Sequence, residues 1–179
     1  MNKTKITQNL LFALVLALIL SLISCNRTKP QSPSNRHAAS QKDSAAIAMV
    51  LLNQRLAQQA DKDVIDFVRK QGAEQFVLEN GGYWVTKTKR TDAEQISENT
   101  TLDIRLIVYD LEEHMLIDSR ENINLKQHEL IAPVLETLHS MHYGESARLV
   151  IPWYAAYGAT GSALIPPYTN LIIDIETYN

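Results

Sequence analysis

A strand-like alternation of apolar and polar positions dominates the second half of the chain. Six segments carry this or a related strand pattern: residues 83–88, 102–109, 115–119, 123–125, 147–151 and 171–176. Within residues 102–109, 147–151 and 171–176, aliphatic side chains occupy every second position, and this period turns one face of a strand towards a core. The polar turn at residues 112–114 joins the second and third segments as a β-hairpin.

A helical period precedes these strands. Apolar residues recur at helical spacing: Ala45, Met49, Leu52, Leu56, Val64, Ile65, Phe67 and Val68. The first half predicts a helix over residues 44–59, with Asp43 or Ser44 as the N-cap. The pattern continues to Gly72, a natural terminator, and leaves open whether one helix or two, separated near Asp61, form this arm. The apolar stripe is wider than a coiled-coil seam, so packing on the chain's own domain competes with pairing in a homodimer, and the first is favoured.

A second, shorter helix lies among the strands. Pro133 suits a first helical turn, and a core-facing stripe of Val134, Leu135, Leu138 and Met141 ends before Gly144. The order of strand, hairpin, strand, short helix, strand, loop and strand predicts an α+β fold. In it a mostly antiparallel sheet wraps around the short helix and is preceded by the helical arm.

The segment between the last two strands is built as a rigid loop. Pro152 ends the preceding strand, because it has no N–H to donate. Gly158 and Gly161 permit turns closed to other residues, and Ile165 precedes a proline pair. Such a loop can present Tyr157, Leu164 and Ile165 as the wall of an apolar pocket that contains one phenol. Whether the neighbouring Trp153 and Tyr154 belong to the core or to the lip of this pocket is not decided by the pattern.

The N-terminus has the features of an export signal. Lys3 and Lys5 precede an uninterrupted apolar run over residues 10–23, which is short for a membrane span and typical of a signal core. The run ends in Leu-Ile-Ser-Cys, which resembles the lipobox of bacterial lipoproteins. We therefore expect cleavage after residue 24 and a lipid on Cys25 that anchors the protein to a membrane of the bacterial cell envelope. An uncleaved anchor with an incidental cysteine is the alternative.

Four segments result: a signal at 1–24, a Pro- and Ser-containing tether at 25–40, a helical arm at 41–80 and a folded domain at 81–179. The chain has 17 Lys and Arg against 20 Asp and Glu. Loss of the two signal lysines leaves 15 − 20, a net charge near −5. No basic cluster with interleaved aromatic residues occurs, which argues against nucleic acid as a partner.

Metal and disulfide chemistry find little support in the residue pattern. Cys25 is the only cysteine, so an internal disulfide is impossible. His139 and His142 could share a helix face, but no third ligand stands at metal spacing, so these residues, His114 and His128 are expected to be surface side chains. We expect neither a metal nor another cofactor.

The C-terminal motifs closely resemble those of FKBP-type peptidyl-prolyl isomerases. The family pattern runs I-x-P, A-Y-G-x-x-G, I-P-P and L-x-F-D-x-E, and here it stands at residues 151–153, 156–161, 165–167 and 171–176. The resemblance extends from about Gly82 to the C-terminus. It implies that a prolyl ring enters an apolar pocket, with Tyr157 and the backbone N–H of Ile131 engaging substrate carbonyls, Ile165 as a wall residue and Asp118 as the pocket aspartate.

The chain departs from the family at several aromatic positions. Val134 stands where the family has a floor Trp, while Ile117 and Ile173 each replace a Phe. The family's second pocket Tyr maps to Leu106 or Ile107, of which alternation turns Leu106 inward. The lining implied by the resemblance is Leu106, Ile107, Ile117, Leu130, Val134, Leu164, Ile165 and Ile173.

The resemblance implies an isomerase or folding helper for proline-containing exported or envelope proteins. Turning an X–Pro bond transfers no proton, so Asp118 is expected to act as a hydrogen-bonding residue of the pocket wall rather than as an acid. The loss of aromatic faces weakens the pocket without necessarily abolishing it. A binding or chaperone module that holds proline-containing partners without turnover is the alternative. The layout most resembles the gliding-motility-associated lipoprotein isomerases.

Overall fold

In the computed structural model, the backbone of residues 36–178 and the side chains of residues 44–178 are described. Cys25, the expected signal and most of the expected tether lie outside the described residues. The chain divides into two compact units, Met1–Ala46 and Ile47–Asn179, and the second contains the folded domain. Among the described residues, no helix combines the length and hydropathy needed to span a bilayer.

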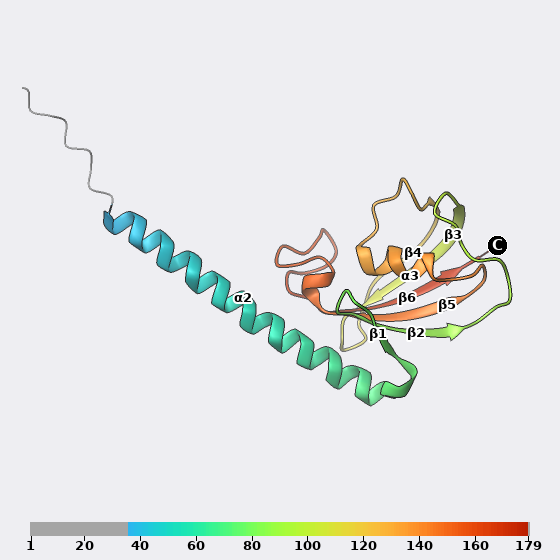
Figure 1. The fold of residues 1–179 in the computed structure, drawn as a ribbon, viewed down its shortest axis with the longest axis horizontal. Helices are drawn as coiled ribbons and strands as arrows, with labels where there is room; N and C mark the ends of the chain where they lie inside the picture. The colour runs from blue at the N-terminus through green and yellow to red at the C-terminus, as the bar shows by residue number, and fades with distance from the viewer. Residues whose placement is uncertain (1–35, 179) are drawn as a thin grey trace, which may run out of the picture. The chain divides into compact units, whose positions relative to one another are not determined.

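The domain is a six-stranded antiparallel sheet with the strand order β1-β2-β5-β6-β3-β4 (Figure 1). The strands are β1 (Val77–Leu78), β2 (Trp84–Lys89), β3 (Thr101–Tyr109), β4 (Met115–Asn124), β5 (Ser146–Ile151) and β6 (Leu171–Thr177). The helices are α2 (Arg36–Gln71), α3 (Ala132–His139) and the 3-10 turns η1 (Ala73–Gln75) and η2 (Trp153–Ala155). This is the predicted α+β architecture.

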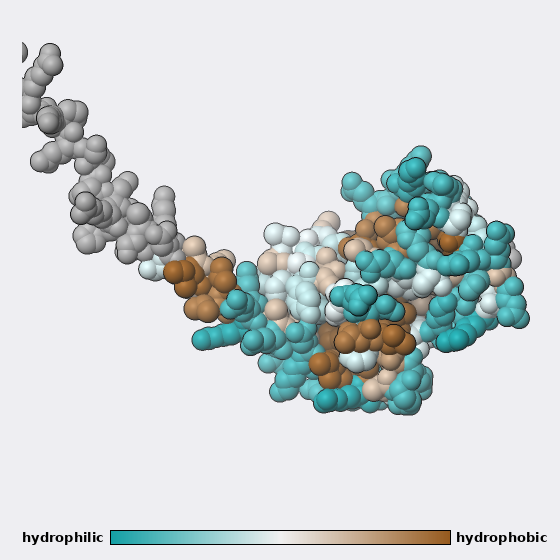
Figure 2. All heavy atoms as spheres, in the orientation of Figure 1, coloured by the Kyte–Doolittle hydropathy of each residue, from teal (hydrophilic) through white to brown (hydrophobic). Residues whose placement is uncertain are grey.

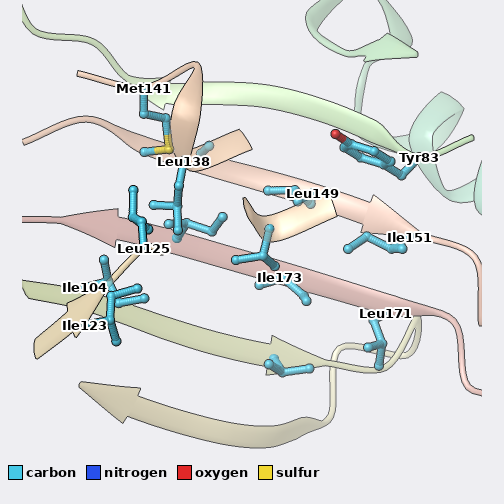
Figure 3. Packing of buried hydrophobic residues seen from close by; sticks show 14 of the residues in the cluster. Tyr83, Ile104, Ile123, Leu125, Leu138, Met141, Leu149, Ile151, Leu171 and Ile173 are labelled. Atoms are coloured by element: carbon cyan, nitrogen blue, oxygen red, sulfur yellow. The ribbon is translucent and has the colours of Figure 1, made fainter. Parts of the chain in front are cut away.

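The main core fills one face of the sheet, beneath α3. Alternate residues of β3, β5 and β6 meet Val134 and Leu138 of α3 and the nearby Met141 (Figure 3). Leu149, Ile151, Leu171 and Ile175 are all fully buried. The predicted alternation therefore produces this layer directly, because every second side chain of a strand points to the same face.

The C-terminal half of α2 covers part of the opposite face. Val64 and Val68 are each 1% exposed and pack with Phe76 and with Val150 of β5. Val150 lies between Leu149 and Ile151 in the strand, so it projects from the other side of the sheet. The apolar stripe of the arm is thus used within the chain over this half.

The structure corrects the start of the arm helix and the strand predicted at residues 123–125, and it shows one helix where the pattern allowed one or two. α2 is one continuous helix that passes through Asp43, Ser44 and Asp61 and begins at Arg36, inside the expected tether. It ends before Gly72, whose φ of 97° stops the helix as expected. Residues 123–125 do not start a separate strand, because β4 runs on to Asn124. The two-residue strand β1 was too short to give a periodic signal.

Candidate proline-binding site

The loop between η2 and β6 is fixed by its own hydrogen bonds. The N–H of Gly161 donates to the carbonyl of Tyr157 at 3.1 Å, and the N–H of Ser162 donates to the carbonyl of Ile165 at 2.8 Å. The Tyr168 N–H donates to the Gly158 carbonyl at 3.1 Å and ties the end of the loop to its start. These bonds give an irregular segment a defined shape.

Gly161 is required by a close backbone approach. Its φ is +67°, and a Cβ at this position would lie 2.3 Å from the carbonyl oxygen of Ile165. Gly158 also has a positive φ, of +69°, but a Cβ added there would meet nothing within 4 Å. The second glycine of the A-Y-G-x-x-G motif is therefore the one that lets Ile165 reach its place.

Tyr157 lies partly buried against the main core. Burial raises the pKa of its phenol, so the hydroxyl stays protonated at neutral pH and can act as a donor. Within the described residues its hydroxyl has no hydrogen-bond partner, whereas Tyr83 donates to Glu136 at 2.8 Å and Tyr168 to Asn53 at 3.1 Å. The Tyr157 hydroxyl is thus available to a ligand carbonyl.

Ile131 is the N-cap of α3, with the extended angles φ −64° and ψ 145°. Its carbonyl accepts from the N–H groups of Val134 and Leu135, but its own N–H has no partner within the described part of the chain. The side chain packs partly buried against the same core as Tyr157. The Ile131 N–H is therefore a second candidate donor for a ligand, on a residue that packs against the same core as Tyr157.

The aliphatic residues of the expected lining separate into two depths. Leu106, Ile117 and Leu130 are half-buried against the main core. The other three, Val134, Ile165 and Ile173, are only 2%, 1% and 2% exposed. These three side chains belong to the core, so the expected floor and wall are covered by the protein's own atoms.

Two expected site residues lie on the outer face of the sheet, and a third lies on the surface of the loop. Asp118 is exposed and accepts two hydrogen bonds from Arg105, on the face of the sheet opposite the main core. Ile107 pairs directly with Asp118 across β3 and β4 and shares that face. This settles the alternative left open by the sequence, since Leu106 and Val108 point to the core. Leu164 is 65% exposed and projects from the loop surface.

Three aromatic residues lie at the two ends of the loop: Trp153 and Tyr154, whose place in the core or the pocket lip the sequence left open, and Tyr168, which no sequence motif singled out. Trp153 is 8% exposed, and its ring packs edge to face with Tyr154 and Tyr168 at centroid distances of 5.7 and 4.8 Å. All three contact α2 through hydrogen bonds. The only sequence signal was the density of aromatic residues at the two ends of the loop, which does not name their partner.

Hollows also occur away from this group. One of about 500 Å³ lies between α2, the β3–β4 turn and the end of the loop; its lining includes Asp63, Asp66, Phe67, Asp110, Glu112 and Tyr168. Another, of about 270 Å³, lies beside an apolar patch over β1, where Val77 and Leu78 are 61% and 56% exposed (Figure 2).

One side-chain group has the chemistry of metal ligands. Ligand atoms of Asp110, Glu112 and His114 lie within 4.8 Å of one another on the β3–β4 turn. His114 bonds to Asp110 at 2.9 Å, and the Asp110 carboxylate raises the pKa of the imidazole. The group lies on the β3–β4 turn, and rotation about an X–Pro bond needs no metal.

The fold is an antiparallel sheet wrapped on a short helix, with apolar residues between the helix and a loop. Two donors that have no partner among the described residues, the Tyr157 hydroxyl and the Ile131 N–H, lie on residues that pack against this core. Residues 93–178 match the family model of the FKBP-type peptidyl-prolyl cis-trans isomerases. The chain therefore carries an FKBP-type domain. The family prediction is confirmed.

A curated relative and two solved structures agree with this result. The FK506-binding protein 2A of Rhizopus delemar is 38% identical over 58 residues, which are 32% of this chain and 35% of that protein. The chain thus matches about a third of the length of this relative. A peptidyl-prolyl cis-trans isomerase from Pseudomonas syringae pv. tomato has 21% identity and a TM-score of 0.60, over 71% of this chain and 94% of the other. FkpA from Escherichia coli has 17% identity and a TM-score of 0.59, over 96% and 81%.

Proposed function

We propose that the domain catalyses the cis–trans isomerisation of X–Pro peptide bonds. The observation that carries the proposal concerns two donors, the Tyr157 hydroxyl and the Ile131 N–H, which have no partner among the described residues. Both residues pack against the same core as the half-buried aliphatic group. These donors can engage carbonyl groups on a proline-containing peptide while the apolar side chains receive the ring.

Such a site lowers the barrier without nucleophile, metal or cofactor. Amide resonance creates a barrier of about 18–20 kcal/mol. An apolar surface removes water from the amide and favours the twisted form, whose carbonyl is less polar. Each tenfold gain in rate requires about 1.4 kcal/mol of preferential binding to that form. The hydroxyl of Tyr157 contributes only as a donor, and its raised pKa keeps it in that state.

An isomerase assay on short X–Pro peptides tests the proposal. Tyr157→Phe removes one donor and is expected to lower kcat/KM by roughly tenfold, the value of one hydrogen bond to a desolvated carbonyl. Tyr109→Phe is the matched control, because Tyr109 lies on the opposite face of β3. Equal activity of wild type and Tyr157→Phe would contradict the assigned role.

Leu164 offers a cleaner apolar test than Ile165. Truncation of Ile165, which is 1% exposed, is expected to cost about 2–5 kcal/mol of folding free energy and would confuse binding with stability. Leu164→Ala changes a side chain that is 65% exposed, so the fold is retained. A rise in KM without a change in the unfolding midpoint supports a substrate contact for Leu164.

A second candidate is a module that binds proline-containing segments without turnover. It is favoured by the burial of Val134, Ile165 and Ile173, which leaves little of the expected floor and wall exposed to a proline ring. Calorimetric titration with the same peptides separates the two functions. Binding that is lost in Leu164→Ala, together with an isomerisation rate equal to the uncatalysed rate, identifies the module.

The site of action is an envelope membrane, and the substrates are exported proteins that contain proline. The support is the order of Lys3, Lys5, the apolar run at 10–23 and Cys25. Cys25→Ala is expected to accumulate uncleaved precursor or to release the protein from membranes. Normal processing and unchanged membrane recovery of this variant would remove the lipid anchor from the proposal.

The N-terminal part of α2 supports pairing with a second copy. Five apolar residues there are 48–61% exposed: Ile47, Met49, Val50, Leu51 and Leu52. A monomer would leave this surface in water. Sedimentation velocity of the wild type is expected to give a dimer, and Leu51→Asp a monomer, with Gln54→Asp as a control at an exposed polar position. A monomeric wild type would exclude pairing through this segment of α2.

A further inference from the structure

One face of α2 contacts both ends of the candidate proline-binding loop. The hydroxyl of Tyr168 donates to Oδ1 of Asn53 at 3.1 Å, and the indole Nε1–H of Trp153 donates to the carbonyl of Leu56 at 3.4 Å. The hydroxyl of Tyr154 donates to the carboxylate of Asp61. Positions 53, 56, 60 and 61 lie on one side of a helix, and Ala60 between them is 2% exposed.

The three aromatic residues are placed where they control the loop. Trp153 and Tyr154 precede Tyr157, and Tyr168 follows the proline pair after Ile165. The backbone N–H of Trp153 donates to Oδ1 of Asn170 at 2.9 Å and joins the two ends of the loop directly. The loop therefore leaves and re-enters the domain through an aromatic cluster that α2 holds from outside.

We propose that α2 positions the proline-binding loop, with Asn53 and Asp61 as positioning residues that act on Tyr157 and Ile165 through Tyr168 and Tyr154. The catalytic consequence rests on the proposed isomerase function. The structural consequence is a loop that the helix holds in one shape, and it is independent of the isomerase function.

The physical reason is the entropy of an irregular segment. Between Ala156 and Asn170 the chain makes no strand or helix, and Ala159, Thr160 and Ala163 are exposed. Each residue that becomes fixed only on substrate binding reduces affinity, because its ordering opposes association. A loop already fixed by α2 avoids that cost. Burial, followed by the bond to Asp61, raises the pKa of Tyr154 to about 12, so the phenol remains a donor across the neutral range.

The first experiment removes one contact at a time in the full chain. Tyr168→Phe deletes the donor, and Asn53→Leu deletes the acceptor at similar size. Both are expected to raise KM for an X–Pro peptide about two- to tenfold with little change in kcat, because the reacting groups are untouched. Asn53→Asp keeps an acceptor oxygen and is expected to restore most of the affinity. Gln54→Leu, on the exposed side of the same turn, is the control.

A second measurement is independent of activity. Amide hydrogen exchange across residues 156–167 is expected to be faster in Tyr168→Phe and Asn53→Leu at an unchanged unfolding midpoint, and unchanged in Gln54→Leu. Unchanged exchange and unchanged KM in both variants would overturn the proposal, as would an equal response of the control. Faster exchange in a protein whose wild type has no isomerase activity would support the positioning role and overturn the proposed function.

Discussion

Arg105 donates two parallel hydrogen bonds to Asp118, from Nε to Oδ1 at 2.9 Å and from Nη2 to Oδ2 at 2.8 Å. Arg105 also approaches Glu176 at 3.8 Å, so the pair belongs to a charged ladder across β4, β3 and β6. The pairing with Arg105 holds the pKa of Asp118 below its usual range. Asp118, which the sequence motif assigned to the pocket, thus lies on the outer face of the sheet and is bonded to Arg105 there.

Asp118→Asn is therefore expected to leave isomerase activity within about twofold of the wild type, since the side chain lies on the face of the sheet opposite the main core. Because the pair is exposed, the unfolding midpoint is expected to change little. Isomerisation rates of Asp118→Asn and Tyr157→Phe, measured side by side, separate the roles of the two residues. A tenfold loss of isomerase activity in Asp118→Asn alone would show that Asp118 belongs to the site.

Gly161→Ala is expected to damage both stability and activity. A left-handed backbone costs a residue with a Cβ about 1–2 kcal/mol, and here the Cβ also meets the Ile165 carbonyl at 2.3 Å. Ile165 and the proline pair must then move. Gly158→Ala carries the same conformational cost without a clash and is the matched control. Thermal unfolding and kcat/KM should both fall further in Gly161→Ala; equal effects would show that the close approach is unimportant.

The surroundings of Glu145 predict that the folded domain loses stability at acid pH. The Glu145 side chain is 3% exposed and bonds to Nζ of Lys87 at 2.8 Å and to the N–H of His142 at 2.9 Å. Burial alone raises the pKa of Glu145, but these bonds outweigh it and lower the pKa below its ordinary value of 4.5. A folded-state pKa below the unfolded one gives stability above about pH 4.5 that is lost as pH falls through the folded value.

Glu145→Gln is expected to lower the free energy of unfolding at pH 7 by about 1–3 kcal/mol, or roughly 2–10 °C in Tm. The difference from the wild type should narrow towards pH 3, where the wild-type carboxylate is also protonated. Thermal unfolding between pH 3 and 7 measures this, with the exposed Glu129→Gln as the control. A constant difference at all pH values would show that packing, not charge, is responsible.

Val64→Ala tests the intrachain packing of α2. The residue is 1% exposed against Phe76 and Val150, so its truncation is expected to cost about 1–3 kcal/mol. Gln58→Ala, at an exposed position of the same helix, is expected to stay within about 0.5 kcal/mol. Urea unfolding of both variants provides the comparison. Indifference to Val64→Ala would mean that this half of the helix does not pack on the domain.

Strand alternation and loop chemistry were readable because they depend on neighbours in the chain. The period of residues 102–109 correctly turned Leu106 and Val108 inward and left Ile107 outside, even where the motif spacing suggested otherwise. Asp118 was misplaced for the complementary reason. Its partner Arg105 is 13 residues away in sequence, and their contact exists only once β3 and β4 pair.

The sequence by itself determined the α+β fold, the end of the arm's helical pattern at Gly72, and a turn-forming loop with glycines at positions 158 and 161, because backbone sterics and short periodicities act locally. Only the folded loop showed that position 161 is the one that needs glycine, because the Ile165 carbonyl approaches it. The sequence did not determine how far Val134, Ile165 and Ile173 sink into the core, since burial depends on all layers at once. Nor did it determine that Asn53, Leu56 and Asp61 hold the loop. Those contacts span 93–115 positions of the chain, and only the packing of α2 on the domain brings their atoms within hydrogen-bonding distance.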